Sequence, residues 1–286
     1  MDKLMMLRVH ILIPLIPTIK PYFCFKIQRK ALPSPFTSEF SIEFEAPIWE
    51  ISPSGNLLLI TTRNKEELQT QFSLFNIATQ DFAFSYLSFE ENWWVSLYLF
   101  NGKQAVFQHY NDTQDIEKRS AFCLDCETQE IIWSIDEVKL HQINPFCIKC
   151  MSIDSDDEYF VEVATGSILQ NVPDKQDIIK GIYPDQYTSE TKHYQVLTNF
   201  ISKNRQGLVG PIDYLEYENW IIISANFQVG HTYSLYLFVY DSEGTLVEEL
   251  ELENDLSGQA VGTFFILDQA LIFVKDKYHV HVRKLS

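Results

Sequence analysis

The chain has 286 residues, a length that suits one or two domains, and 46% of them are apolar, which excludes a wholly disordered chain. Aromatic residues make up 14% of the chain, and residues of this kind favour β-strands. The formal net charge of −17 argues against nucleic acid and anionic membrane surfaces as partners, because like charges repel.

Residues 1–37 are predicted to form an irregular N-terminal arm that contributes at most one strand, Tyr22–Ile27. The apolar run Val9–Ile16 is similar to the core of a secretory signal, but Pro14 and Pro17 interrupt it and no small-residue cleavage site follows. The 5 cysteines are an odd number without a dense framework, which fits a reducing compartment. We therefore expect a cytoplasmic protein rather than a secreted or periplasmic one.

Residues 38–286 are predicted to form a single all-β domain, a β-propeller-like ring of about five four-stranded antiparallel blades. The clearest hairpin is Ile48–Ser52, the turn Pro53-Ser54-Gly55 and the strand Asn56–Ile60. Hairpins of this kind recur about every 50 residues, as the blades of a propeller do. The further expected strands are 72–76, 81–87, 93–100, 104–110, 120–125, 130–135, 146–153, 159–164, 167–171, 212–217, 220–227, 233–241, 245–252, 263–267, 270–276 and 278–285. The last unit is one strand short, and Phe40–Ala46 is expected to supply it, so that strands from both ends of the domain close the ring.

One segment departs from the strand pattern. Between residues 189 and 203, apolar side chains recur at helical spacing and predict an amphipathic helix. This helix lies in a long connection between the third and fourth units. We expect it to plug the ring or cover a blade edge, with a lid or binding element as the alternative.

Several hairpins are similar to those of known propellers. The stretch Phe122–Trp133 resembles the hairpins of quinoprotein-type propellers, and Ile48–Ile77 resembles the blades of WD-repeat proteins. From about Phe40 on, and especially at Gly210–Asp241 and Thr263–Lys277, the chain resembles a bacterial domain-of-unknown-function family of the Bacteroidota type. This resemblance implies a bacterial origin and carries over no catalytic residue.

Two C-x-x-C motifs form the sharpest local signal for a site. Cys123 and Cys126 form the first, and Cys147 and Cys150 form the second. Their spacing fits a four-cysteine zinc ribbon or a redox pair. However, neither motif has the glycine or proline of a zinc knuckle, and Cys123, Cys147 and Cys150 lie in expected strands, so we expect the cysteines to pack in the core. No metal ligand or cofactor is therefore assigned.

Two weaker candidates contain carboxylates and imidazoles. The acidic turn 154–158 offers oxygen ligands for Ca²⁺, but Tyr159 stands where an EF-hand loop has glycine, so a solvated turn is expected. His279 and His281 share one face of a strand and begin a metal site without an evident third ligand, so they are interpreted as an edge-strand pair. His109 and His141 are interpreted as structural.

The sequence does not identify the function or any catalytic residue. It contains no G-x-S-x-G elbow, Walker loop, G-x-G-x-x-G fingerprint or H-E-x-x-H helix. We expect a non-catalytic binding or scaffold propeller whose partner is a protein or peptide, and the sequence leaves its oligomeric state open. The alternatives are a hydrolase or lyase with a site assembled from several blades at the channel mouth, and a module stabilised by metal at the four cysteines.

Overall fold

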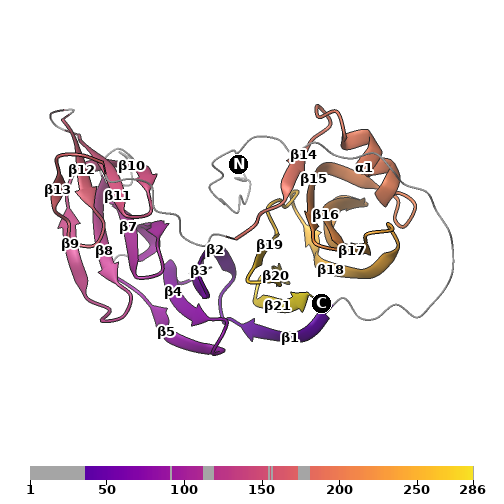
Figure 1. Cartoon of the computed structure of the whole chain (residues 1–286), viewed down its shortest axis with the longest axis horizontal. Coiled ribbons are helices and arrows are strands. Elements are labelled where there is room, and N and C mark those ends of the chain that lie inside the picture. Colours follow the sequence, from indigo (N-terminus) through magenta and orange to yellow (C-terminus); the bar gives the residue numbers. More distant parts are fainter. Residues whose placement is uncertain are drawn as a thin grey trace. The chain divides into compact units, whose positions relative to one another are not determined.

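The structure, a computed structural model, describes residues 36–90, 92–111, 119–153, 155, 157–172 and 181–285 (Figure 1). The described residues form two compact units. One unit runs from Ala46 to Gly181, and the other combines the segment that ends at Glu45 with the chain from Ile182 on. Within the described residues, no helix has the length and apolarity that a membrane span requires.

The unit between Ala46 and Gly181 contains three antiparallel sheets, each a meander of four strands in sequence order. The first sheet has strands β2 (Ile48–Ser54), β3 (Leu57–Asn64), β4 (Gln69–Asn76) and β5 (Asp81–Leu87). A short 3-10 turn η1 (Asn92–Trp94) leads to the second sheet, with strands β6 (Val95–Phe100), β7 (Gln104–Tyr110), β8 (Arg119–Asp125) and β9 (Ile131–Ile135). The third sheet has strands β10 (Val138–Asn144), β11 (Cys147–Ser152), β12 (Glu158–Glu162) and β13 (Ile168–Leu169).

The other unit contains the remaining two sheets and the helix. The fourth sheet has five strands, β14 (Asp185–Tyr187), β15 (Leu208–Tyr217), β16 (Trp220–Val229), β17 (Thr232–Asp241) and β18 (Leu246–Leu256). The helix α1 (Tyr194–Ile201) lies between β14 and β15 in the chain. The fifth sheet has the strand order β1-β21-β20-β19, with β1 (Phe36–Glu43), β19 (Phe264–Leu267), β20 (Ala270–Lys275) and β21 (His279–Leu285).

These blade-like meanders confirm the predicted all-β, propeller-like class with one helical insertion. Three details of the prediction were wrong. The strand β10 was missed because only three of its seven residues, Val138, Leu140 and Ile143, are apolar, and β14 was missed because it is short. Trp93 and Trp94 lie in the turn η1 and not in a strand. The helix is shorter than residues 189–203, and the expected strand Tyr22–Ile27 lies outside the described residues.

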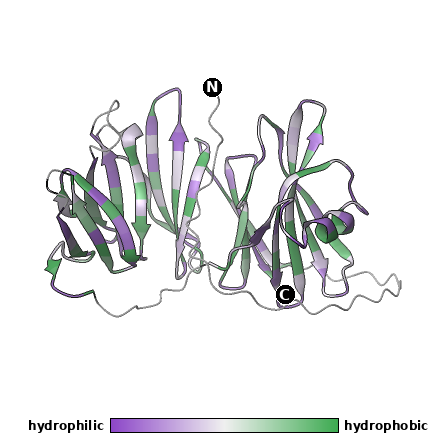
Figure 2. Ribbon diagram, turned by 90° about the horizontal axis from the view of Figure 1, so that it is seen from above, coloured by the Kyte–Doolittle hydropathy of each residue, from purple (hydrophilic) through white to green (hydrophobic). Residues whose placement is uncertain are grey.

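Adjacent sheets of the first unit enclose two apolar layers (Figure 2). Leu59 and Phe72 of the first sheet pack against Val95 and Phe107 of the second, and the rings of Phe72 and Phe107 meet edge to face with centroids 4.7 Å apart. A similar layer joins the second and third sheets. Burial of these side chains supplies the main driving force for folding, at roughly 25 cal/mol per Å² of apolar surface.

The fourth sheet is covered on both faces within its own unit. One face packs on the fifth sheet through residues such as Leu237 and Phe273. The other face packs against α1, whose Ile201 is fully buried among Phe227 and Phe238 (Figure 1). The helix therefore covers a face of the fourth sheet, whereas the sequence predicted that it would plug the ring or cover a blade edge. Whether the five sheets form one ring, and whether residues 38–286 form one domain, stay predictions.

Strand β1 completes the fifth sheet by pairing with β21, so that the two ends of the described chain lie side by side (Figure 1). This confirms the expectation that a strand near residues 40–46 supplies the missing position, although the strand covers Phe36–Glu43. Side-chain ion pairs reinforce the backbone pairing. The guanidinium of Arg283, only 9% exposed, lies 2.7 Å from a Glu39 oxygen and 2.6 Å from a Glu248 oxygen.

Replacing Arg283 by methionine should weaken the pairing of β1 with the fifth sheet. The Arg283→Met variant leaves Glu39 and Glu248 without their cation, and we expect it to lower the free energy of unfolding by about 1–3 kcal/mol. Thermal unfolding of the full chain measures the effect. Lys284→Met, on the exposed face of the same strand, is the matched control and should change stability little. Equal melting temperatures for the two variants would contradict this role of Arg283.

Candidate functional site

The four cysteines of the C-x-x-C motifs are buried and free, and they are distributed over different layers. Cys126 belongs to the layer between the first and second sheets, whereas Cys123 and Cys150 belong to the layer between the second and third. The Cys123 thiol donates a hydrogen bond to the carbonyl of Val163, at 3.4 Å. Burial raises the pKa of Cys126 and of Cys150 to about 12, so both thiols are neutral. The described residues contain no cluster of three or more metal-ligating side chains.

His279 and His281 lie on one face of β21, as expected, but carboxylates and an aromatic ring engage them separately. His279 Nδ1 lies 2.6 Å from an Asp276 oxygen, and His281 Nδ1 lies 3.7 Å from a Glu39 oxygen. The His281 ring stacks on Phe273 with centroids 5.1 Å apart. Burial lowers the pKa of His281. The two histidines thus take part in the side-chain ion pairs between β1 and β21.

The other residues singled out in the sequence are dispersed. His141 is exposed on β10, and His109 lies near the end of β7. Of the acidic turn 154–158, Asp154 and Asp156 lie outside the described residues, and Glu158 pairs with Lys149 at 2.7 Å.

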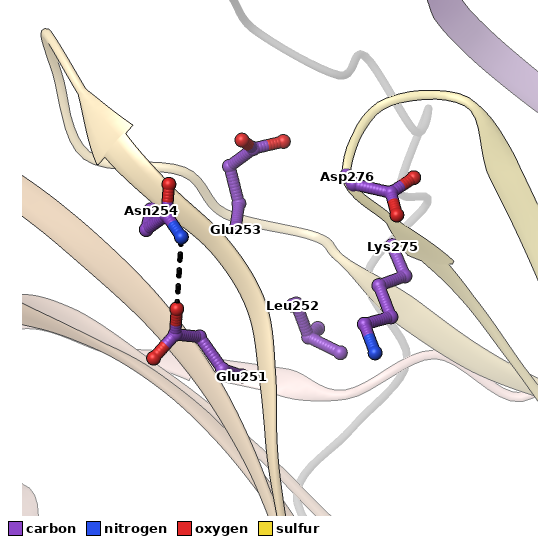
Figure 3. A pocket seen from close by; sticks show the side chains of 6 residues that line it. All are labelled: Glu251, Leu252, Glu253, Asn254, Lys275 and Asp276. Carbon is purple, nitrogen blue, oxygen red and sulfur yellow. Dashed lines mark hydrogen bonds between the residues drawn. The ribbon is translucent and has the colours of Figure 1, made fainter.

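A polar hollow of about 290 Å³ borders β18 and the end of β20 (Figure 3). It is lined by Glu251, Leu252, Glu253, Asn254, Lys275 and Asp276. One of its carboxylates is already engaged, because Asn254 donates a hydrogen bond to Glu251 at 3.0 Å and the hydroxyl of Tyr236 donates another. These hydrogen bonds lower the pKa of Glu251, with the Tyr236 hydroxyl contributing most. Because Glu251 already has hydrogen-bond partners within the protein, we do not assign the hollow as a binding site.

A buried carboxyl in the fourth sheet is satisfied in the same way. Asp213 is 3% exposed, and burial raises its pKa to about 6. It accepts hydrogen bonds from the backbone of Gly262 at 2.7 Å and from the Gln186 amide at 3.4 Å. Nearby, the Asn226 side chain donates to and accepts from the backbone of Ala260. These contacts fix the connection from β18 to β19, so Asp213 has a structural role.

A third polar group lies at one end of the layer between the first and second sheets and differs from these two. It consists of Trp49, Glu50, Arg63, Trp93 and Tyr110, and we name it the Trp–Arg cluster. Trp49 and Glu50 follow Ile48 near the start of strand β2, where the register with β3 shifts at a bulge. Bulges re-aim side chains and are frequent beside functional sites. The backbone N–H of Arg63, on β3, donates to the carbonyl of Pro47 at 2.9 Å, which holds the two strand ends together.

The guanidinium of Arg63 lies against two indole rings. Its central carbon is 4.7 Å from the centroid of Trp49 and 5.6 Å from that of Trp93. Both distances fall within the range of a cation–π contact. Trp49 and Trp93 are half-buried, so part of each ring stays accessible to a partner.

Glu50 lies on the same face of the first sheet as Arg63. Thr61 pairs directly with Glu50, and Thr61 and Arg63 are two residues apart on β3, which places all three side chains on one face. Burial raises the pKa of Glu50 to about 7, although the positive charge of Arg63 and a hydrogen bond with Ser52 act in the opposite direction. Burial also lowers the pKa of Arg63, which nevertheless stays charged.

Several buried polar atoms of this face lack a hydrogen-bond partner in the described structure. They are Thr61 Oγ1, Thr70 Oγ1 and Arg63 Nε. Thr61 and Thr70 are 1% and 0% exposed, and Thr70 pairs directly with Arg63 across β3 and β4. Since nearly all buried polar groups in proteins are paired, an unsatisfied group of this kind points to a bound water, ion or ligand atom.

The cluster was missed in the sequence because its members come from four separate elements without fixed spacing. One signal was available: Trp49 and Trp93 occur just before or at the start of the first strand of two successive sheets. Chemically, the cluster combines an aromatic surface, one cation and a carboxyl that is close to half-protonated at neutral pH. It can hold an anionic or polar group, and it can exchange a proton.

Comparison with known proteins shows that part of the chain is similar to a protein family. Residues 51–133 match the model of a family described as a domain of unknown function (DUF4905). This stretch includes Arg63, Trp93 and Tyr110 of the Trp–Arg cluster. No curated protein matches the chain.

Solved structures give matches at low identity. A DUF4221 family member from Bacteroides vulgatus is 9% identical with a TM-score of 0.36, and the match covers 88% of this chain and 97% of that one. The β-propeller domain of the Trilobed protease from Pyrococcus furiosus is 9% identical with a TM-score of 0.29, over 81% of this chain and 65% of that one. Hsv2 from Kluyveromyces marxianus is 11% identical with a TM-score of 0.29, over 80% and 76%.

The raised pKa of Glu50 makes stability depend on pH. The folded-state pKa of about 7 lies above the ordinary value of 4.5, so the contribution of protonated Glu50 is lost as the pH rises between these values. We expect Glu50→Gln, which cannot ionise, to be more stable than the unchanged chain above pH 7 by about 3 kcal/mol and similar to it below pH 4.5. Thermal unfolding across this range tests the prediction. Glu66→Gln, an exposed carboxyl of the same sheet, is the control, and an equal gain for that variant would refute the assignment to Glu50.

Proposed function

We propose that this protein is a non-catalytic binding protein that docks a partner protein or peptide on the Trp–Arg cluster. The observation that carries the proposal is the Arg63 guanidinium, held against two half-buried indoles without a salt bridge to any described residue. Tryptophan, tyrosine and arginine are the residues that dominate the energetics of protein interfaces.

The surroundings of the cluster support binding rather than scaffolding alone. Arg205 and Arg283 also lie against aromatic rings, but each forms a salt bridge with a carboxylate of its own unit. Arg63 has the same aromatic contact without such a neutralising partner in the described structure. An interface residue that is positioned but not neutralised is ready to pair with a group on a partner.

An enzyme with a site assembled from several blades is the second candidate, and Glu50 is the observation that favours it. A carboxyl with a pKa of about 7 suits general acid–base catalysis near neutral pH. Glu50 and Arg63 come from the first sheet, whereas Trp93 and Tyr110 come from the turn and the strand that follow it. The residues of the cluster therefore come from separate strands and turns, as the residues of such an enzyme site would.

We also propose a cytoplasmic location and a bacterial origin of the Bacteroidota type. Free, buried cysteines agree with a reducing compartment. The resemblance of Gly210–Asp241 and Thr263–Lys277 to a family from these bacteria supports the origin.

Binding of the full chain to an immobilised set of defined short peptides, with acidic, neutral and basic members, tests the proposed function. We expect a subset to bind, and we expect Trp49→Ala and Arg63→Gln each to weaken that binding at least about tenfold, as for interface hot spots. Lys65→Gln removes an exposed positive charge from the same hairpin and should leave binding unchanged. Binding that is insensitive to both cluster variants would refute this docking surface.

Mass spectrometry of the bound peptides distinguishes the two candidate functions. Peptides recovered intact after incubation agree with a binding protein. Cleavage or elimination products that disappear in Glu50→Gln would instead favour the enzyme, because Gln cannot transfer the proton.

A further inference from the structure

We propose that the group which docks at Arg63 is a carboxylate of the partner, and that its binding is coupled to the uptake of one proton by Glu50. This inference rests on the proposed function and names its ligand chemistry and its regulation. Four observations on the described residues support it.

The first observation is the unused donor capacity of Arg63. Its guanidinium forms no salt bridge with a described residue, and its Nε–H is buried without a hydrogen-bond acceptor there. A guanidinium presents its N–H groups as a planar fork, which matches the two oxygens of a carboxylate. The chain therefore holds a carboxylate-binding group that its own described carboxylates do not occupy.

The second observation concerns the shape and charge of the surroundings. The indoles of Trp49 and Trp93 contact the guanidinium and leave a flat, apolar border around it. A planar carboxylate with one negative charge fits such a border, whereas a phosphate carries nearly two charges and usually engages several donors. The net charge of −17 on the chain further disfavours a dianion.

The third observation is the competing carboxyl. Glu50 lies on the same sheet face as Arg63 and acts on its charge, as the mutual effects on their pKa values show. When Glu50 is ionised, its negative charge offsets that of Arg63 and repels an incoming carboxylate. When Glu50 is protonated, the guanidinium keeps an uncompensated positive charge. Since the pKa of Glu50 is about 7, both states are populated near neutral pH.

The fourth observation is the set of unsatisfied hydroxyls beside these two groups. Thr61 pairs with Glu50 and Thr70 pairs with Arg63, and both hydroxyls are fully buried without a partner in the described structure. Hydroxyls donate or accept as required, so they can adapt to either protonation state of Glu50 or to an ordered water that accompanies the ligand. Buried hydroxyls without a hydrogen-bond partner in the described structure therefore lie beside both Glu50 and Arg63.

Other ionisable groups lie on the elements packed around Glu50. They are Arg63 on β3, His109 and Tyr110 on β7, and Arg119 on β8, with the Arg119 guanidinium 5.2 Å from the Tyr110 ring. The His109→Gln variant below is therefore the control for a contribution of this imidazole.

The test measures the affinity of the full chain by calorimetry for a short peptide with one central aspartate and blocked ends, and for its asparagine counterpart. If the protonated state alone binds, the aspartate peptide should bind about tenfold more weakly at pH 8 than at pH 6. The asparagine peptide should bind weakly at both pH values. At pH 8, titrations in buffers of different ionisation enthalpy should show the uptake of close to one proton.

Variants separate the contributions of the individual groups. Glu50→Gln should bind the aspartate peptide equally well at both pH values, and Arg63→Gln should lose the binding at both. Lys65→Gln should behave as the unchanged chain, and His109→Gln should keep the pH dependence. The asparagine peptide with a free C-terminus, and acetate alone, distinguish a side-chain carboxylate from a terminal one and from a free acid.

The outcomes distinguish a failure of this inference from a failure of the proposed function. Arg63-dependent binding that is equal at both pH values, or whose pH dependence moves with His109, would overturn the proton coupling and leave the docking surface intact. Equal affinity for the aspartate and asparagine peptides would overturn the carboxylate. Absence of binding for every peptide at both pH values would overturn the inference together with the proposed function.

Discussion

Inner strands of the first, second and fourth sheets are buried on both faces, and this double burial constrains the rest of the molecule. Strands β3, β7 and β16 each carry a run of consecutive buried residues. A sheet of this kind must be covered on each side. In the described units a neighbouring sheet provides the cover in three layers, and α1 provides it in a fourth. The insertion between β14 and β15 is thus part of the core and not an appendage.

Apolar burial does not explain the polar side chains at one end of the layer between the first and second sheets. The face that carries Leu59 and Phe72 continues into Thr61, Arg63 and Thr70. Burying these groups without partners costs free energy, as does burying the carboxyl of Glu50. Sites that break a local rule at such a cost are frequently functional. The buried Asp213 shows the contrast, because its oxygens are satisfied and it fixes a loop.

The distribution of the few positive charges supports the same distinction. The chain has 22 lysine and arginine residues against 39 aspartate and glutamate residues, so most cations have carboxylates available. Arg205 is 2.9 Å from Glu249 and stacks on Tyr236, and Arg283 joins β21 to β1. Arg63 has comparable aromatic contacts and forms no salt bridge with a carboxylate of the described structure, although Glu50 lies on the same sheet face. Among the described residues of this acidic protein, such a cation is well suited to pair with an acid from outside.

The sequence by itself determined the all-β class, most of the strands and the pairing of a strand near residue 40 with the C-terminal strand, because alternation and turn residues are local signals. It also placed the helical insertion. The tertiary structure alone decided which faces meet. It separated Cys126 from Cys123 and Cys150, and it brought Trp93 of one sheet connection against Arg63 of the preceding sheet. The physical reason is that the residue pattern of a strand determines only which side chains share a face of its sheet. Packing between sheets determines which faces meet, and the Trp–Arg cluster forms where two such faces meet.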